Sequence, residues 1–384
     1  MQIGTGEIPA CRLLCSAGRA LRAFSRRGIE FPIRAVRTLK TTRVAIIAAT
    51  CLLTGGAAQA HEKWFYEGPR MPLRWDLLSR PMLLGFLAGV AVLLGVSYAA
   101  WKFRGRRDFI PGPEAFGARA ERRMAFYGLV PAILGLHIAV PLLVEGVLGR
   151  LFSPNNAMAP GYAHFIGLGE VLVGLCLFYG GMARLAAMAL AAIWLAGMGV
   201  VGPEPMLENL HYLGFAGFFF LAGRGPIAVD RLLFPRLEPP AWMVGHAPTA
   251  LRAGVGLSLA IVGVTEKLGN LPLAGAFLKQ YPFINFTSKL GIPMSDELFA
   301  LCAGSVEVYA GLMILFGIFP RTIILVTLFP LNLSLTVFNW GELVGHLPYY
   351  GSLAFLLVWT PRDRDLWVDG LRLGPLACDP PPIV

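Results

Sequence analysis

Long apolar stretches separated by short polar segments make up most of the chain after residue 80. Nine of these stretches have about the 20 residues that a helix needs to cross a bilayer. They cover residues 81–101, 124–148, 164–182, 184–201, 210–222, 251–268, 298–319, 321–338 and 343–360. Because the apolarity continues on all faces over lengths that strands do not reach, each stretch predicts a helix. The pattern predicts an all-α integral membrane protein with about nine transmembrane helices in the mature chain.

Two parts of this pattern repeat. Five residues return at a fixed offset of 137 positions: Gly167, Glu170, Gly174, Gly180 and Arg184 correspond to Gly304, Glu307, Gly311, Gly317 and Arg321. The repeat predicts tandem duplicated four-helix transmembrane bundles, residues 119–236 and 237–372, in the same orientation. An extra N-terminal helix precedes them within residues 61–118, and residues 373–384 form a tail.

The correspondence weakens away from the central helices. Two Glu-His pairs precede the last spans of the two units, at offsets of 134 and 135: Glu208 with His211, and Glu342 with His346. Upstream, Arg123 and Arg252 each open the first helix of a unit in this alignment, 129 positions apart.

The composition agrees with a membrane protein. Hydrophobic residues make up 56% of the chain and charged residues 15%, proportions that are rare in a soluble domain of this length. The net charge of +10 is concentrated at the start, where residues 1–43 hold nine Lys or Arg against two acids. The basic character therefore does not indicate a nucleic-acid partner.

Residues 37–60 have the features of a secretory signal. A basic segment is followed by an apolar core at residues 44–56 and by the small-residue sequence Ala58-Gln59-Ala60. Cleavage there makes His61 the mature N-terminus, and an uncleaved membrane anchor is the alternative. Residues 1–60 are therefore interpreted as a basic leader.

The distribution of Lys and Arg predicts the orientation. With the mature N-terminus outside, the inner segments carry sixteen basic residues and the outer segments carry eight. By the positive-inside rule, the chain is a multi-pass protein of the bacterial inner membrane with a periplasmic N-terminus and a cytoplasmic C-terminus. In this orientation most candidate polar residues fall at the outer ends of helices.

Carboxylates within apolar spans are the first candidates for function, because they are costly to insert. Glu170 and Glu307 occupy this position in the two units, and a structural hydrogen bond or ion pair with His211 or His346 is the alternative reading. Glu266 and Lys267 form a charge pair at the outer end of a span. They either extend into water or face a cavity in which Lys267 attracts an anion or a reduced quinone.

Histidine and carboxylate on facing helices also suggest a metal site. His137, Glu170 and His211 form one possible set in the first unit. A mature N-terminal His61 binds copper or zinc through its amine and ring in a second hypothesis. We favour the alternative for residues 61–65, an interfacial segment with its aromatic side chains at the lipid headgroups.

Cysteine spacing argues against thiol redox chemistry. Cys176 and Cys302 lie in separate predicted helices, and the sequence contains no C-x-x-C pair. A redox centre is therefore expected to come from a partner protein.

The sequence resembles the DoxX-like family of four-helix membrane proteins, some of which are subunits of thiosulfate:quinone oxidoreductase-type systems. The resemblance rests on the glycine, glutamate and arginine pattern from Gly304 to Arg321, on Glu342 with His346-Leu347-Pro348, and on the weaker copy that ends at Glu208 and His211. It covers two tandem units, residues 119–372. It implies a polar cavity open to the periplasm and a link to quinones.

Two functional hypotheses follow. In the first, the protein is a membrane subunit of a quinone-linked electron-transfer system. Its predicted catalytic residues are Glu170, Glu307, Glu342 and His346, and its predicted substrate-binding residues are Glu208, His211, Glu266 and Lys267. In the second, it has a non-enzymatic role as an assembly factor or in handling a small solute or a metal, copper or zinc, with His61, His137 and His211 as ligands.

Overall fold

The described part of the chain is built from helices. The computed structural model describes residues 61–223, 225–234, 239–338 and 340–373. Within these ranges it contains no β-strand, only an isolated bridge between Arg150 and Ala157. The all-α prediction is therefore confirmed. The expected leader of residues 1–60, its cleavage site and the tail after residue 373 lie outside the described residues.

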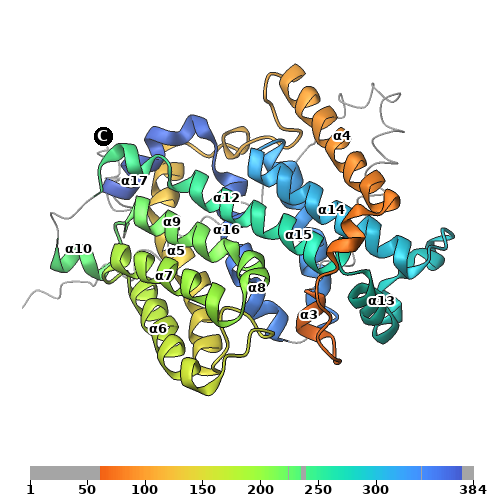
Figure 1. The fold of residues 1–384 in the computed structure, drawn as a ribbon. Helices are drawn as coiled ribbons and strands as arrows, with labels where there is room; N and C mark the ends of the chain where they lie inside the picture. The colour runs from red at the N-terminus through yellow and green to blue at the C-terminus, as the bar shows by residue number, and fades with distance from the viewer. Residues whose placement is uncertain (1–60, 224, 235–238, 339, 374–384) are drawn as a thin grey trace, which may run out of the picture. The chain divides into compact units, whose positions relative to one another are not determined.

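Helices occupy all nine predicted spans (Figure 1). They are α4 (Pro81–Phe103), α5 (Ala120–Val147), α6 (Pro160–Tyr179), α7 (Ala183–Val200), α9 (Leu210–Ala222), α12 (Ala247–Val262), α14 (Asp296–Phe316), α15 (Pro320–Leu335) and α16 (Trp340–Val358). The π-helical segment η4 (Gly263–Leu268) continues α12.

Six stretches in the described residues are long and apolar enough to cross a membrane. They are Pro81–Phe103, Ala120–Val147, Pro160–Tyr179, Ala183–Val200, Ala241–Leu268 and Asp296–Phe316. α9 and α15 are apolar but shorter. The chain is thus a helical, multi-pass membrane protein by the length and composition of its helices.

Short helices connect and flank the long ones. Near the start of the described chain these are α3 (Glu62–Phe65), η2 (Trp75–Ser79) and η3 (Pro113–Phe116). In the middle lie α8 (Pro203–Glu208), α10 (Val229–Leu233), α11 (Ala241–Val244), α13 (Leu271–Gln280), η5 (Pro282–Ile284) and η6 (Phe286–Leu290). The described residues end with η7 (Pro361–Asp363) and α17 (Arg364–Leu373).

Two groups of helices pack in the same order. α5 contacts α6, which contacts α7, and α7 contacts α9; correspondingly, α12 contacts α14, α14 contacts α15, and α15 contacts α16. The groups join through α9 against α12 and through α16 against α5. α4 packs against α14 at the edge of the second group, away from α6 and α7 (Figure 1).

Close helix contacts occur at glycines that correspond between the two groups. A Cβ atom added to Gly146 of α5 would lie 2.7 Å from the Gly167 carbonyl, and one added to Gly263 would lie 2.9 Å from the Gly304 carbonyl. Both would also touch the repeated glutamate, Glu170 or Glu307. Small residues allow these backbones to approach.

These contacts align α5 with α12, the first helices of the two groups, at an offset that differs from the expected one. Gly146 and Gly263 lie 117 positions apart, and so do Ala139 and Gly256, which face Gly174 and Gly311. The expected offset of 129, based on Arg123 and Arg252, does not agree with the packing. A basic residue at a helix end is common in membrane proteins, so it is a weaker marker of register than a close glycine contact.

The repeated arginines bind main-chain carbonyls of the last helix in each group. Arg184 Nε donates to the Phe220 carbonyl at 3.0 Å, and Arg321 Nε donates to the Leu357 carbonyl at 3.2 Å. Both pairs are 36 residues apart along the chain. The arginines thus satisfy carbonyls that a helix end leaves without an intrahelical donor, in addition to any role in orientation.

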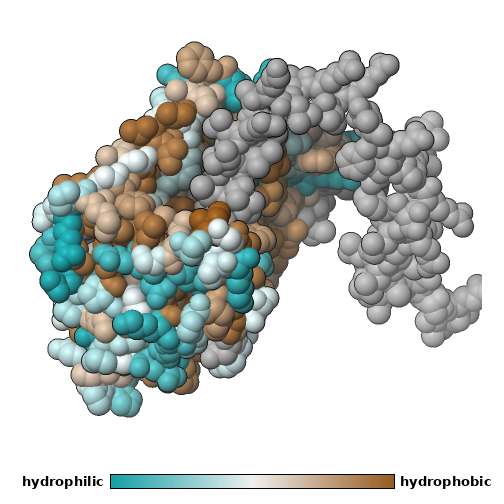
Figure 2. All heavy atoms as spheres, turned by 90° about the vertical axis from the view of Figure 1, so that its right-hand side faces the viewer, coloured by the Kyte–Doolittle hydropathy of each residue, from teal (hydrophilic) through white to brown (hydrophobic). Residues whose placement is uncertain are grey.

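The helix surface is apolar where it is not packed. On α4, Val92 is 65% exposed and Leu93 is 54% exposed. Figure 2 shows hydrophobic side chains at the surface on the face toward the viewer, next to hydrophilic ones. Extended apolar surface of this kind suits contact with lipid.

Candidate functional site

The start of the described chain enters the protein interior. His61 and Glu62 are 8% and 2% exposed, and Lys63 to Tyr66 are half-buried. Phe65 stacks on Phe338 with ring centroids 4.2 Å apart, and α13 packs against α3. The favoured interpretation of residues 61–65 as an interfacial segment is therefore not met, because the polar side chains point into the helix bundle and have specific partners there.

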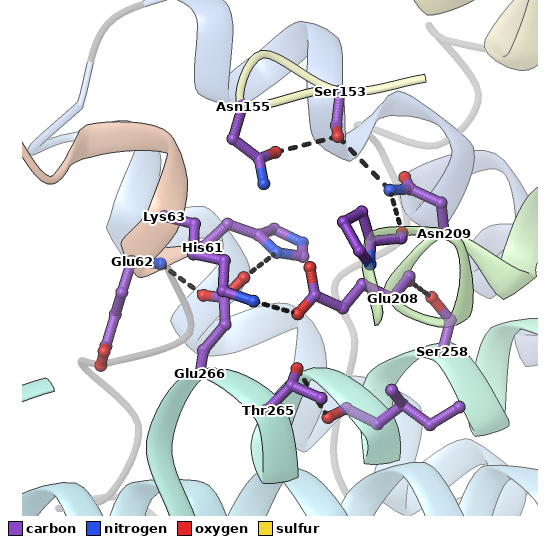
Figure 3. A network of polar contacts seen from close by, with 12 residues as sticks. His61, Glu62, Lys63, Ser153, Asn155, Glu208, Asn209, Ser258, Thr265 and Glu266 are labelled. Carbon is purple, nitrogen blue, oxygen red and sulfur yellow. Dashed lines mark hydrogen bonds and ion pairs between the residues drawn. The ribbon is translucent and has the colours of Figure 1, made fainter. Parts of the chain in front are cut away.

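Glu266 holds this segment through both carboxylate oxygens. Its Oε1 lies 3.2 Å from His61 Nδ1, and its Oε2 accepts the Glu62 backbone N–H at 2.6 Å. Figure 3 shows the His61 ring and the Glu266 carboxylate pointing toward each other. Glu266 is 1% exposed, and burial in the protein makes such charge-assisted bonds strong.

Lys267 lies beside Glu266 in sequence but binds different partners. It is 0% exposed, and its Nζ lies 2.9 Å from Glu307 Oε1 and 4.0 Å from Glu62 Oε1. Five of the six residues of the π-helical turn η4 are buried, Glu266 and Lys267 among them. Single π-helical turns are frequent at functional sites.

Lys63 supplies a second ammonium group. Its Nζ lies 2.7 Å from Glu204 Oε1 and 2.5 Å from Glu208 Oε1, both on α8. Figure 3 shows its amine between the Glu266 region and Glu208. The Glu204 side chain is 30% exposed, so this end of the site is the one nearest to solvent.

The rings of His211 and His346 both lie near that of Tyr349. Their ring centroids are 4.7 Å and 6.0 Å from that of Tyr349. His211 Nδ1 is 3.0 Å from the Ser258 hydroxyl, which is 2.8 Å from the Tyr349 hydroxyl and also donates to the Glu208 carbonyl. Ser258 therefore links α8, α9, α12 and α16.

His346 connects this group to the start of the chain. Its ring centroid is 5.4 Å from that of His61 and 5.5 Å from that of Trp64, which itself stacks on His61 at 3.9 Å. His346 Nδ1 is 3.3 Å from Glu342 Oε1. The Glu342 carboxylate is fully buried, and neither of its oxygens accepts a hydrogen bond within the described residues.

We call these residues the buried charge cluster. Its members are His61, Glu62, Lys63, Glu208, Glu266, Lys267, Glu307, Glu342 and His346. Five of them are carboxylates and two are ammonium groups. With every group in its ordinary charge state and neutral histidines, the carboxylates outnumber the ammonium groups by three. In that charge state the cluster is acidic, and the expected role of Lys267 in attracting an anion is weakened because Glu307 already pairs with it at 2.9 Å.

The environment shifts the pKa values of the cluster members outside the membrane-spanning stretches. Burial raises the pKa of Glu62 to about 8, against the lowering effect of Lys267. Burial also raises the pKa of Glu208, although Lys63 opposes this. Burial by itself lowers the pKa of His61 and that of Lys63. The nearby carboxylates, first Glu266 for His61 and Glu208 for Lys63, outweigh burial, so both pKa values are raised. All four groups bind protons more tightly in the folded chain.

The first unit places its candidates elsewhere. Glu170 is 0% exposed and accepts the Phe152 backbone N–H at 3.0 Å, while Phe152 stacks on Tyr212. His137 Nδ1 bonds the Ile133 carbonyl within α5. Neither of the two expected partners of Glu170, His137 and His211, is bonded to it. In the first unit the repeated glutamate fixes a loop, whereas in the second it pairs with a lysine.

The predicted metal ligands are separated in the same way. His61 binds Glu266, His137 binds a backbone carbonyl and His211 binds Ser258. Among the described residues, no three His, Cys, Asp or Glu side chains are placed to hold one metal ion. The set of His137, Glu170 and His211 is therefore not brought together.

A pocket of about 400 Å³ adjoins the cluster. Its walls include aromatic residues from the start of the described chain, from the loop after α13 and from α16: Trp64, Phe65, Tyr66, Tyr281 and Trp340. Glu145 and Arg150 add charge, and Arg150 Nε lies 2.7 Å from Glu145 Oε2. Gly341 and Val344 line it on either side of Glu342 in sequence.

Sequence reasoning missed Glu62, Lys63, Ser258 and Tyr349 as members of the site. A hydroxyl inside the apolar span 251–268 is the one available signal for Ser258. For Glu62 and Lys63 the sequence has no comparable signal, because their role depends on the burial of a segment far away in the chain. Glu208, His211, Glu266, Lys267, Glu307, Glu342 and His346 were singled out and do lie together.

No protein-family model, curated protein or solved structure matches this chain.

Proposed function

We propose that this protein is a membrane subunit of a quinone-linked electron-transfer system, with the pocket beside the buried charge cluster as its quinone site. The pocket carries this proposal. A quinone ring is flat, has apolar faces and carries two carbonyl acceptors on its edge. Aromatic walls with a few polar groups and a volume of several hundred Å³ are typical of sites for such ligands.

The neighbouring acid and base groups suit the proton transfers of a quinone. Reduction of a quinone to a quinol takes up two electrons and two protons, and oxidation releases them. Glu342 and His346 lie next to the pocket wall and contact each other at 3.3 Å, and His346 is in ring contact with His61. Carboxylate and imidazole in proximity are the usual groups for proton exchange. The electrons come from a partner protein in this proposal.

The arrangement in the membrane is part of the proposal. Two four-helix units, residues 119–236 and 237–372, follow the extra helix α4, and they arose by duplication. The recurrence of the glycine contacts and of the arginine-to-carbonyl bonds at equal spacing supports this. The resemblance to the DoxX-like family points the same way. With a periplasmic N-terminus in a bacterial inner membrane, the pocket faces the periplasm.

Bound quinone is the direct test. The full chain is purified in mild detergent from bacterial membranes, extracted with organic solvent and analysed for quinones by liquid chromatography and mass spectrometry. We expect about one quinone per chain, as for a ligand buried in a formed pocket. Trp340→Ala removes a pocket wall and is expected to lose most of it, while Trp75→Ala, at an exposed position outside the pocket, keeps it.

Quinone at the level of an unrelated membrane protein, or equal amounts in both variants, would contradict the proposal. The same sample, prepared without chelator, is measured for metal. About one copper or zinc per chain that disappears in His211→Ala would support metal handling in its place.

A further inference from the structure

The position of His61 has a consequence that is independent of quinone binding. The His61 ring and the N–H group of the next residue are both held by Glu266. Its backbone nitrogen is one residue away from the Glu62 nitrogen, a separation of about 3 to 4 Å along the chain. The main chain at His61 is thus close to the Glu266 carboxylate.

The cluster has more negative than positive groups around this point. Glu266, Glu342 and Glu208 all act on His61 electrostatically. Glu342 is 0% exposed and its Oε1 lies 3.3 Å from His346 Nδ1, and Glu62 Oε2 is buried and accepts no hydrogen bond in the described chain. Buried carboxylates are costly unless they are protonated or paired, and a further positive group at this point would pair with them.

The sequence before His61 has the small residues that signal peptidases require. Ala58 and Ala60 stand three and one positions before His61 and follow an apolar core. We propose that the chain is cut between Ala60 and His61, and that the new α-ammonium group of His61 is bound within the buried charge cluster as its third cationic group.

The cut is a hydrolysis. Water, acting with a membrane signal peptidase of the host cell, breaks the peptide bond and yields the Ala60 carboxylate and the His61 amine, which takes up a proton. Lys63 and Lys267 supply the other two cationic groups, so only the His61 α-ammonium would be made by processing. Export and completion of the site are linked in this way, since a chain that keeps its leader has a neutral amide at the same position.

Two measurements on the full chain test this. The protein, with a C-terminal affinity tag, is purified from bacteria with an intact secretion pathway, and its N-terminus is determined by sequencing and intact mass. We expect His61 as the first residue. The folded protein is then treated with an amine-acylating reagent at pH 7.5, where an ordinary α-amine, with a pKa near 8, reacts readily.

In the folded protein we expect the His61 amine to react at least about tenfold more slowly than the same amine in unfolded protein, because a carboxylate environment keeps it protonated and burial excludes the reagent. Glu266→Gln is expected to remove most of this protection. Glu297→Gln, at an exposed carboxylate on α14, is the matched control and keeps it. Exposed Lys279 reports equal reagent activity in all samples.

A cleavage variant covers the case in which Glu266→Gln does not fold. Ala60→Leu blocks the cut and Ala60→Gly permits it. We expect hydrogen exchange of residues 61–66 to be faster in the Leu variant only. A wild-type chain that begins elsewhere than His61, or a His61 amine that reacts as fast when folded as when unfolded, would overturn the proposal.

Discussion

At the residue scale, the main feature is the neutralisation of a fully buried lysine. Lys267 is 0% exposed and lies 2.9 Å from Glu307 and 4.0 Å from Glu62. A buried ammonium without partners would lose its hydration with nothing in return. The three residues come from α3, η4 and α14, so the charge contacts also tie these elements together.

Removal of the lysine charge is expected to destabilise the fold strongly. Lys267→Met keeps the apolar stem but leaves Glu307 without its cation, which costs about 3 to 5 kcal/mol for broken buried pairs. Adding Glu307→Gln is expected to restore a large part of this loss. The measurement is denaturant unfolding in detergent. A single variant as stable as the wild type would show that the ion pair does not stabilise the fold.

The four raised pKa values predict how the docking of α3 depends on pH. Glu62 has a pKa of about 8 when docked, against an ordinary value of 4.5, so docking takes up a proton between pH 4.5 and pH 8. The docked segment is then favoured at low pH and weakens by about 1.4 kcal/mol for each pH unit through this window. The raised pKa of His61 acts in the same direction above pH 6.5.

Hydrogen exchange of residues 61–66, corrected for the intrinsic effect of pH, measures this docking. We expect less protection at pH 8 than at pH 5. Glu62→Gln, which cannot ionise, is expected to flatten most of the dependence between pH 5 and 8. Protection that rises with pH would mean that Glu62 is ionised in the docked state.

At the element scale, the two helix groups are joined by contacts that correspond to each other. Gly214 of α9 faces Gly254 of α12, and Gly351 of α16 faces His137 of α5. Gly214 and Gly351 lie 137 positions apart, which is the offset of the sequence repeat. His137 and Gly254 lie 117 positions apart, which is the offset found above between α5 and α12. Both interfaces therefore use one geometry, and His137 occupies the place of a glycine in one of them.

The glycine interface predicts a sensitive position. A Cβ atom added at Gly254 would lie 2.4 Å from the Gly214 Cα, so α9 and α12 must separate. We expect Gly254→Ala to destabilise the protein by about 1 to 3 kcal/mol in denaturant unfolding. Gly161→Ala, where no atom lies within 4 Å, is the control and is expected to be neutral or slightly stabilising. Equal effects of both would contradict close α9–α12 packing.

The starts of corresponding helices are stabilised by different segments. The Asp230 carboxylate accepts the Met182 and Ala183 backbone N–H groups at α7. At α15 the Asp108 carboxylate accepts those of Arg321 and Thr322. Asp108 lies after α4, so the loop from the extra helix replaces in the second group what α10 supplies in the first.

At the scale of the whole molecule, polar groups separate between the two ends of the helices. The buried charge cluster and the pocket are at one end, together with α3, α8 and α13. Arg184 and Arg321 begin helices at the other end, where α17 packs against α5 and Asp363 of η7 lies 2.7 Å from Arg123 near the start of α5. In the orientation that the positive-inside rule predicts, the cluster would face the periplasm.

Labelling of single cysteines tests the orientation. In a cysteine-free background, Arg70→Cys and Arg107→Cys each place a thiol at an exposed position, on opposite sides of α4. Because α4 spans the membrane in this arrangement, a membrane-impermeant maleimide is expected to label residue 70 in spheroplasts and residue 107 only after lysis. The opposite result would place the cluster on the cytoplasmic side.

The helices and much of the site were predictable from the sequence. Apolar runs of spanning length specify helices because backbone groups in lipid must be satisfied internally, and all nine runs are helical. Glu307 was a candidate because charge in such a run is costly, Glu266 and Lys267 because they form a charge pair at the end of a run, and Glu342 and His346 because the pair recurs in the repeat. Both inferences depend on local composition, which the sequence contains in full.

The partners of those residues were decided by the tertiary structure. Glu170 and Glu307 occupy equivalent positions in the repeat, yet one fixes the loop at Phe152 and the other binds Lys267. The segment that begins at His61 was expected at the lipid surface. Its burial depends on Glu266, more than 200 residues away, and on the shape of the space between two helix groups. Neither is encoded in any local pattern of the chain.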